Sequence, residues 1–205
     1  MRGPPPPSPT AARRAGRRSP AHSPHRPTRP RSGCLFEGPA GNHSLLPAAG
    51  LVGKISSDYN FSISSCSNTG SIVSALGNAG GLVGTTSTDG KNSIIVSSYN
   101  TGSVKGASSA GGITSGFSSY SHLHLNIADV YNTGAIENTA PQTSEHGAGG
   151  IVGTMSQNAE ELVIAGAYNV GSVTAAEGTP AGAVVGLLKG ASRASVTLGD
   201  TVFYR

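Results

Sequence analysis

Two stretches of the sequence decide the fold: Ala79-Gly80-Gly81-Leu82-Val83-Gly84 and Ser98-Tyr99-Asn100-Thr101-Gly102-Ser103-Val104. Both recur along the chain with nearly the same period. The second glycine of the first block, or its equivalent, stands at positions 50, 81, 112, 150 and 183, so the spacings are 31, 31, 38 and 33 residues. The asparagine of the second block stands at positions 68, 100, 132 and 169, spaced by 32, 32 and 37 residues. Two independent blocks that keep one period indicate tandem repeats.

Each repeat contains three short runs that are typical of β-strands. One is the glycine-leucine block, one precedes the asparagine, and one follows it and ends in an isoleucine or valine. The runs before the asparagine cover residues 61–64, 93–96, 123–128 and 162–165. All are bounded by Gly, Asn, Ser or Asp and are too short for a helix. The longer third spacing places an insertion in Glu137–Gly147, which we expect to be a lengthened loop at one corner.

A single repeat of this kind cannot bury its apolar face alone, so the repeats are expected to stack as successive coils. The sequence predicts an all-β protein, a parallel β-solenoid or β-helix of about five coils built from repeats of 31–38 residues. Equivalent residues would then form aliphatic ladders in a narrow core. These ladders are Leu51, Leu82, Ile113, Ile151 and Val184; Ile63, Ile95, Ile127 and Ile164; and Ile72, Val104, Ile136 and Val173.

The repeated asparagine is expected to form a ladder of stacked side-chain amides at a corner, as in cross-β stacks. The glycine two residues later suits a left-handed or crowded backbone. Counting by two places the residue two before the asparagine on the inner face together with the Ile or Val four after it. The first of these inner positions holds Cys66, Ser98, Val130 and Ala167. The isoleucine five before the asparagine is out of this register, so a bend or bulge must intervene.

Residues 1–47 differ in composition from residues 48–205. They hold eight Arg and one acid, Glu37, giving a net charge of +7, whereas residues 48–205 hold six Lys or Arg and nine Asp or Glu, giving −3. A Pro/Arg-rich segment with few apolar side chains cannot recover its ordering entropy by burial, so we expect a disordered tail at 1–47 followed by a repeat domain at 48–205. The charge of the tail indicates no specific nucleic-acid partner. Cys34 and Cys66 do not fix the redox compartment, because one pair is not a disulfide framework.

The ends of the repeat domain carry two further expectations. No stretch reaches the roughly 20 apolar residues that cross a bilayer, and residues 1–31 lack the apolar core of a signal peptide. Only Leu35-Phe36 and Leu45-Leu46 are available to cover the strand edges of the first coil. We therefore expect the chain to be part of a longer protein, and isolated copies to associate end to end through Leu51–Gly53 and Ile63.

The two blocks resemble the GLUG-motif repeat family, whose pattern is roughly A-G-G-L-V-G followed by S-Y-N-T-G-S-V. The resemblance covers about residues 48–205, and Thr114-Ser115, Ala183 and Ser67 depart from it. Such repeats occur mainly in large bacterial surface and secreted proteins, including adhesin-like and IgA-protease-type proteins, where they look like spacers or stalks. The resemblance thus implies an extracellular or cell-surface location, and it brings no catalytic residues.

One pair of histidines is a candidate for metal binding. His122 and His124 alternate along a strand and would face the same side, and Asp129 and His146 are the nearby residues that could complete a site. An outward polar face is the interpretation that the sequence favours, so no metal ligand and no cofactor is assigned. Glycosidase chemistry needs two positioned acids, but the nine acids of the repeat domain are scattered, with one adjacent pair at 160–161. No catalytic residue is assigned, and the chain is predicted not to be an enzyme.

Tyr99, Tyr131 and Tyr168 share one position of the repeat. Facing outward, they would form an aromatic strip for a host or cell-wall glycan or for a protein partner; packed at the corner, they would shield the asparagine ladder. The predicted function is a non-catalytic structural or adhesive spacer module of a surface or secreted protein. The alternative is a carbohydrate-binding or carbohydrate-active β-helix.

Overall fold

The computed structural model describes residues 3, 34–37, 47–117, 122–139, 145–156, 160–189, 195–199 and 203–204. The chain divides into two units, residues 1–31 and 32–205. All of the described strands belong to the second unit. Most of the predicted tail, residues 1–33 without Gly3 and 38–46, lies outside the described residues.

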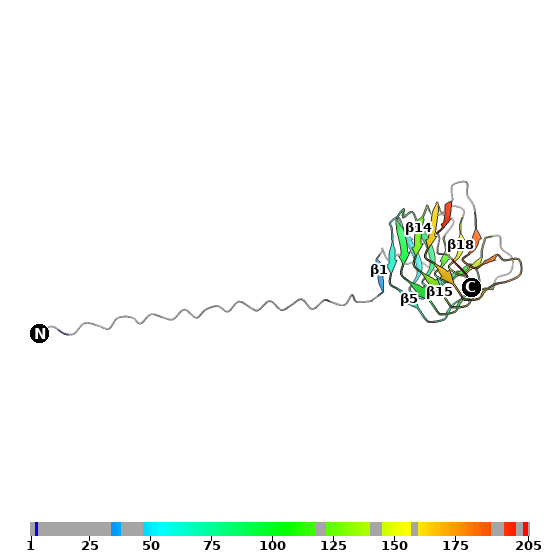
Figure 1. Ribbon diagram of the computed structural model, residues 1–205, viewed down its shortest axis with the longest axis horizontal. Coiled ribbons are helices and arrows are strands. Elements are labelled where there is room, and N and C mark those ends of the chain that lie inside the picture. Colours follow the sequence, from blue (N-terminus) through cyan, green and yellow to red (C-terminus); the bar gives the residue numbers. More distant parts are fainter. Residues whose placement is uncertain are drawn as a thin grey trace. The chain divides into compact units, whose positions relative to one another are not determined.

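The second unit is an all-β parallel solenoid, as the repeats predicted (Figure 1). It winds through about four turns with a repeat of about 32 residues. Within the described residues, each of the four complete coils contributes one strand to each of five sheets, and the last coil adds a strand to four of them. Five copies of the first strand enclose four complete turns, which accounts for the five coils expected from the sequence.

The five sheets are numbered by the order in which the chain meets them within one coil, starting from β2. The first contains β2 (Ala48–Ala49), β7 (Ala79–Gly80), β12 (Ala110–Gly111), β17 (Ala148–Gly149) and β22 (Ala181–Gly182). The second contains β3 (Val52–Ser57), β8 (Val83–Thr88), β13 (Thr114–Gly116), β18 (Val152–Met155) and β23 (Val185–Leu188). The third contains β1 (Leu35–Glu37), β4 (Ser62–Ser64), β9 (Ser93–Val96), β14 (His124–Ala128), β19 (Glu161–Ala165) and β24 (Ser195–Leu198). The fourth contains β5 (Ser67–Asn68), β10 (Tyr99–Asn100), β15 (Tyr131–Asn132), β20 (Tyr168–Asn169) and β25 (Phe203–Tyr204). The fifth contains β6 (Ile72–Ser74), β11 (Val104–Gly106), β16 (Ile136–Asn138) and β21 (Val173–Ala175).

Each coil has more strands than the three runs seen in the sequence. The glycine-leucine block divides into an Ala-Gly strand and a second strand that begins at the valine, with a bend between them. A Cβ at Gly81 would overlap the carbonyl oxygen of Gly112 in the next coil, so this bend requires glycine. The run after the asparagine begins, rather than ends, at its isoleucine or valine, because the Tyr-Asn pair forms a short strand of its own.

The aliphatic ladders form the interior, as predicted. Ile63, Ile95, Ile127 and Ile164 are paired in register along the third sheet and are fully buried. Leu82, Ile113 and Ile151 are also fully buried, while Leu51 and Val184 at the two ends are partly buried against the same cluster. This narrow stack of aliphatic side chains explains how a chain with 5% aromatic residues forms a core.

The interior is divided into two apolar clusters, which corrects one expectation. Cys66, Val130 and Ala167 belong to the larger cluster, whereas Val104 and Ile136 pack in a smaller one with alanines of the first sheet. The simple alternation predicted across the asparagine fails because the chain bends directly after it. The residue two before the asparagine and the residue four after it therefore both face the interior, but they pack in different apolar clusters.

The bend required before the asparagine lies three residues ahead of it in every coil. Ser65, Ser97, Asp129 and Gly166 have φ values of 55°, 49°, 52° and 58°. A left-handed residue here turns the chain between the third and fourth sheets and changes the register between the isoleucine and the asparagine. Non-glycine residues adopt this conformation at a cost of about 1 kcal/mol or more, and parallel pairing on both sides holds them there.

The predicted tail contributes a strand to the first coil. β1 pairs antiparallel with β4, with Phe36 opposite Ile63, and Cys34 forms a disulfide with Cys66. Residues 34–37 were expected to be disordered, but a covalent link and backbone pairing to an otherwise open strand edge order them. At the other end, β24 and β25 continue the third and fourth sheets in parallel. No helix long and apolar enough to cross a bilayer occurs in the described part of the chain.

Candidate functional site

The three repeated tyrosines form a continuous stack on the outside of the fourth sheet. Tyr99, Tyr131 and Tyr168 are opposite one another in the parallel register. Their ring centroids are 4.7 and 5.1 Å apart, with interplanar angles of 1° and 8°. All three are half-buried, and the partial burial of Tyr131 together with its two neighbouring phenols raises the pKa of its hydroxyl.

The stack decides which part of each tyrosine is available to a partner. Parallel rings at these distances cover one another's faces, so ring edges and phenol hydroxyls point outward. The neighbour of Tyr99 in the first coil is Ser67, which leaves that end of the stack without an aromatic cover. The tyrosine stack therefore presents a row of hydrogen-bonding hydroxyl groups, and the face of the Tyr99 ring ends the row.

Behind the tyrosines lies the asparagine ladder, which is confirmed. The side-chain amide of each asparagine donates to the Oδ1 of the next, at 2.8 Å from Asn68 to Asn100 and 2.7 Å in the two following steps. Each amide also donates to the carbonyl oxygen of the glycine two residues later, at 2.7–2.9 Å. These glycines do not have positive φ; a Cβ at Gly134 would overlap the carbonyl oxygen of Gly102, so the corner is crowded rather than left-handed. Because neighbouring strand residues face opposite sides, the tyrosines lie outside and the asparagines inside.

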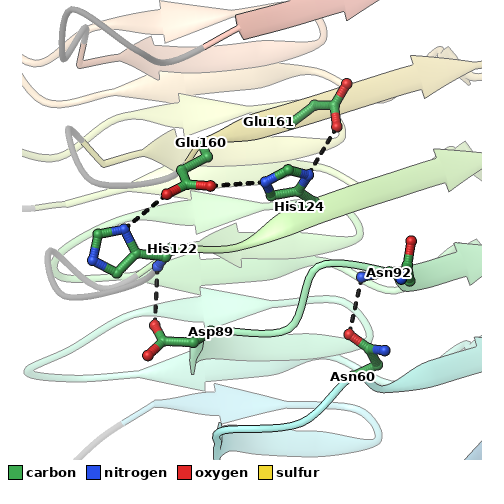
Figure 2. A network of polar contacts seen from close by, with 7 residues as sticks. All are labelled: Asn60, Asp89, Asn92, His122, His124, Glu160 and Glu161. Atoms are coloured by element: carbon green, nitrogen blue, oxygen red, sulfur yellow. Dashed lines mark hydrogen bonds and ion pairs between the residues drawn. The ribbon is translucent and has the colours of Figure 1, made fainter.

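The two histidines are bound to glutamates of the next coil. Figure 2 shows His122 and His124 reaching Glu160 and Glu161. Nδ1 of His122 lies 3.0 Å from Oε1 of Glu160, and Nε2 of His124 lies 2.8 Å from Oε2 of the same carboxylate. Nδ1 of His124 lies 3.0 Å from Oε2 of Glu161. Hydrogen bonds from His124 and then from His122 hold the pKa of Glu160 below its ordinary value.

This His-Glu cluster differs from the site suggested by the sequence. Asp129 lies at the left-handed bend before Asn132, and His146 lines a separate cavity, so neither joins the two histidines. Among the described residues, no group of three or more His, Cys, Asp or Glu side chains is placed to hold a metal ion. The cluster continues a polar corner in which Asp89 accepts a hydrogen bond from the backbone of His122, and Asn60 accepts one from the backbone of Asn92 (Figure 2).

The sequence contained a signal for the His-Glu pairing. His124 stands eight residues before Asn132, and Glu161 stands eight residues before Asn169, so the two are equivalent positions of successive repeats. They are paired directly in the structure. Alignment of the repeats by their asparagines would have placed the Glu160–Glu161 pair beside the histidines.

Two of the hollows in the described part of the chain are lined largely by polar side chains. A groove of about 210 Å³ crosses the third sheet and is lined by Lys91, Asn92, His124, Asn126 and Glu161, with Ile94 and Val163 between them. A second cavity of about 240 Å³ is lined mainly by hydroxyl groups and includes His146. Sequence reasoning did not find either one, because their residues come from coils that are far apart in the chain.

One solved structure is similar to this chain. It is described as a putative immunoglobulin A1 protease from Bacteroides ovatus, with a TM-score of 0.54 and 21% sequence identity. The match covers 74% of this chain and 49% of the solved one, so this chain spans about half of that protein. At this identity the likeness shows the solenoid fold alone. No known family description and no curated protein matches the chain, so the resemblance to GLUG-motif repeats depends on the two sequence blocks.

Proposed function

We propose that the repeat domain is a non-catalytic structural and adhesive spacer in a surface or secreted protein. The observation that carries this proposal is the tyrosine stack, which runs over three coils of one rigid, regularly paired solenoid. Each added coil lengthens such a rod by about 4.8 Å and leaves its cross-section unchanged. A repeat module of this kind holds an attached partner at a set distance while it presents the same chemistry on each coil.

Two observations support a location outside the cell. The disulfide between Cys34 and Cys66 suits an oxidising compartment. The solved neighbour is described as a putative IgA1 protease, which fits the same setting. The parallel pairing on every side of the coil and the buried amide ladder suit a domain that must keep its shape outside the cell.

The proposed absence of catalysis rests on how the acids are used. A glycosidase requires two acids at a defined separation. Glu160 and Glu161, the adjacent acids of the repeat domain, are both bound to His124. Glu137 forms an ion pair with Lys105, and Glu145 forms one with Lys189. These carboxylates stabilise contacts between segments of the solenoid.

The adhesive role is tested with the purified full chain on a glycan array and on immobilised mucin. Replacement of Tyr99, Tyr131 and Tyr168 by serine should abolish binding, because it removes the whole row of ring edges and hydroxyls. Thr101→Ser with Thr133→Ser is the matched control, since both threonines are exposed directly beside the stack. Binding that is as strong in the tyrosine variant as in the wild type, or turnover of polysaccharide or protein substrates by the wild type, would contradict the proposal.

The groove across the third sheet favours the alternative function, a carbohydrate-binding β-helix. Its amide, imidazole and carboxylate groups with apolar residues between them can hydrogen-bond sugar hydroxyls and cover an apolar ring face. Asn126→Ala and Glu161→Gln test it on the same array. Loss of glycan binding in these variants, with normal binding by the tyrosine variant, would favour the alternative.

A further inference from the structure

The irregular positions of the repeat converge on one place. Four of the five coils have glycine at the end of the first sequence block, whereas the third has Ser115. The insertion Glu137–Gly147, which lengthens one repeat, contributes Glu145 and His146. Both departures line the cavity of about 240 Å³. Departures from the local pattern that a fold requires are found chiefly at functional sites. Here two independent departures from the repeat line the same cavity, which points to a binding site.

The strand beside this cavity is distorted by the same departures. Gly116 has φ of 135°, and β13 pairs with β8 at Thr114 and then only through a bridge between Thr86 and Phe117. The pair between Thr85 and Gly116 is therefore missing, and both residues line the cavity. The equivalent pair is present between the other coils, so the second sheet is interrupted where the cavity lies.

Hydroxyl groups dominate the cavity. Thr85, Ser109, Ser115, Thr154 and Ser156 line it, and all five are nearly buried. Oγ of Ser109 lies 2.8 Å from Oγ1 of Thr154 and 3.3 Å from Nδ1 of His146. A hydroxyl can donate and accept at once, so the wall can match a ligand that carries several hydroxyl groups of its own.

The cavity has little net charge. Glu145 and Lys189 both line it and form an ion pair with each other. Burial lowers the pKa of His146, with opposing effects from Glu145 and Lys189, which favours its neutral form. Such a site does not select an anion or a cation.

We propose that this cavity binds one neutral sugar ring, such as a hexose or an N-acetylhexosamine at the end of a glycan. Its volume is below that of sites for drug-sized ligands, about 300 Å³ or more, which suits a single ring. Ser109, Thr154 and His146, which line the cavity and bond one another, would hydrogen-bond the sugar hydroxyls. The site is separate from the tyrosine stack, so the proposal stands or fails independently of the adhesive role proposed above.

The test is saturation-transfer NMR on the full chain with glucose, galactose, mannose and N-acetylglucosamine. Glucosamine and N-acetylneuraminate serve as cationic and anionic comparisons. At least one neutral sugar should receive saturation from the wild type. Ser109→Ala and Thr154→Val should each weaken its binding by roughly tenfold, because each leaves sugar hydroxyls without a partner.

Thr88→Val is the matched control, since it removes another buried threonine hydroxyl from the second sheet, one that bonds the carbonyl oxygen of Tyr59 outside the cavity. It should bind like the wild type, and thermal melts confirm that all variants are folded. Three outcomes overturn the proposal: no neutral sugar binds, which leaves water as the occupant; neither cavity variant weakens binding; or a charged sugar binds more tightly than the neutral ones.

Discussion

Cys34 and Cys66 form a disulfide that ties β1 to the first coil. Their Cα atoms are 4.2 Å apart although 32 residues separate them in the sequence. Cys66 is fully buried at the position occupied by Ser98, Val130 and Ala167 in the following coils. The bond therefore extends from the solenoid core to the strand that covers the outer edge of β4. It closes a sheet edge that would otherwise offer unpaired backbone groups to another chain.

Loss of this disulfide should destabilise the protein. Cys34→Ser leaves Cys66 as a small buried thiol and removes the link, which should lower the free energy of unfolding by roughly 3–4 kcal/mol through the lost constraint on the unfolded chain. Denaturant unfolding in oxidising and reducing buffer measures this difference. The variant and the reduced wild type should have the same midpoint, and two reactive thiols in the native, unreduced protein would show that the bond is absent.

Two truncations separate the disulfide from the rest of the tail. Deletion of residues 1–31 should leave the denaturation midpoint unchanged, because Cys34 and β1 remain. Deletion of residues 1–44 should lower it as Cys34→Ser does. A wholly disordered tail at 1–47, as its composition predicts, would make both deletions neutral; the disulfide is the reason that the longer one should not be.

The asparagine ladder should be the least replaceable polar feature of the core. Asn132 receives a hydrogen bond from Asn100 and donates to Asn169 and to the carbonyl of Gly134. Asn132→Ala removes four hydrogen bonds in the interior, including the one from the backbone N–H of Gly134, which should cost roughly 3 kcal/mol or more. Asn126→Ala is the control, because Asn126 is exposed on β14 and its replacement should stay within about 0.5 kcal/mol. Equal midpoints for the two variants in chemical denaturation would contradict the ladder.

The repeat period was sufficient to predict the solenoid and the residues that stack. Equivalent residues of parallel coils must lie above one another, so the spacing of Asn100 and Asn132 predicted their contact directly. The bend at Ser97 left no comparable signal, because serine, aspartate and glycine share the position and only the backbone angle unites them. The pairing of Cys66 with Cys34 was not predicted either, because Cys34 lies outside the repeats and the strand beside it, β1, pairs antiparallel rather than as a parallel coil.

The candidate sites, too, could be predicted from the sequence only where their residues follow the repeat. The tyrosines stack because they occupy one repeated position, and the sequence named all three. The cavity at Ser109 and His146 arises from departures from the repeat, and its shape depends on the distorted strand at Gly116. The repeat period predicts which residues occupy equivalent positions in successive coils. The positions that depart from the repeat could be identified in the sequence, but the sequence did not show that they meet at one cavity.

Glu160 should contribute to the acid sensitivity of the protein. Its hydrogen bonds with His124 and His122 hold its pKa below the ordinary 4.5, so the unfolded chain binds more protons than the folded one as the solution becomes more acidic. The stabilisation is therefore complete above about pH 4.5 and is lost as the pH falls through the folded pKa. Glu160→Gln should flatten this acid limb slightly, whereas Glu177→Gln at an exposed turn should not. Unfolding midpoints measured from neutral to acid pH compare the three proteins, and parallel curves would exclude the effect.

The ends of the solenoid should allow copies to stack. In the described part of the chain, β2 and β3 end the first and second sheets on one side, and β22 and β23 end them on the other. Leu51 and Val184 are the partly buried ends of one aliphatic ladder, so a second copy could continue that ladder in the register already used between coils. The edge at Ile63, also expected to take part, is occupied by β1.

Self-association should therefore depend on the redox state. Reduction, or Cys34→Ser, frees β1 to leave β4, and the third sheet then becomes available to β24 of another copy. We expect wild-type protein to show concentration-dependent sedimentation that becomes stronger in Cys34→Ser and weaker in Leu51→Lys, which places a charge at the open end of the ladder. Sedimentation velocity over a wide concentration range, in oxidising and reducing buffer, measures all three proteins. A single monomeric species under every condition would show that the exposed strand edges do not pair between copies.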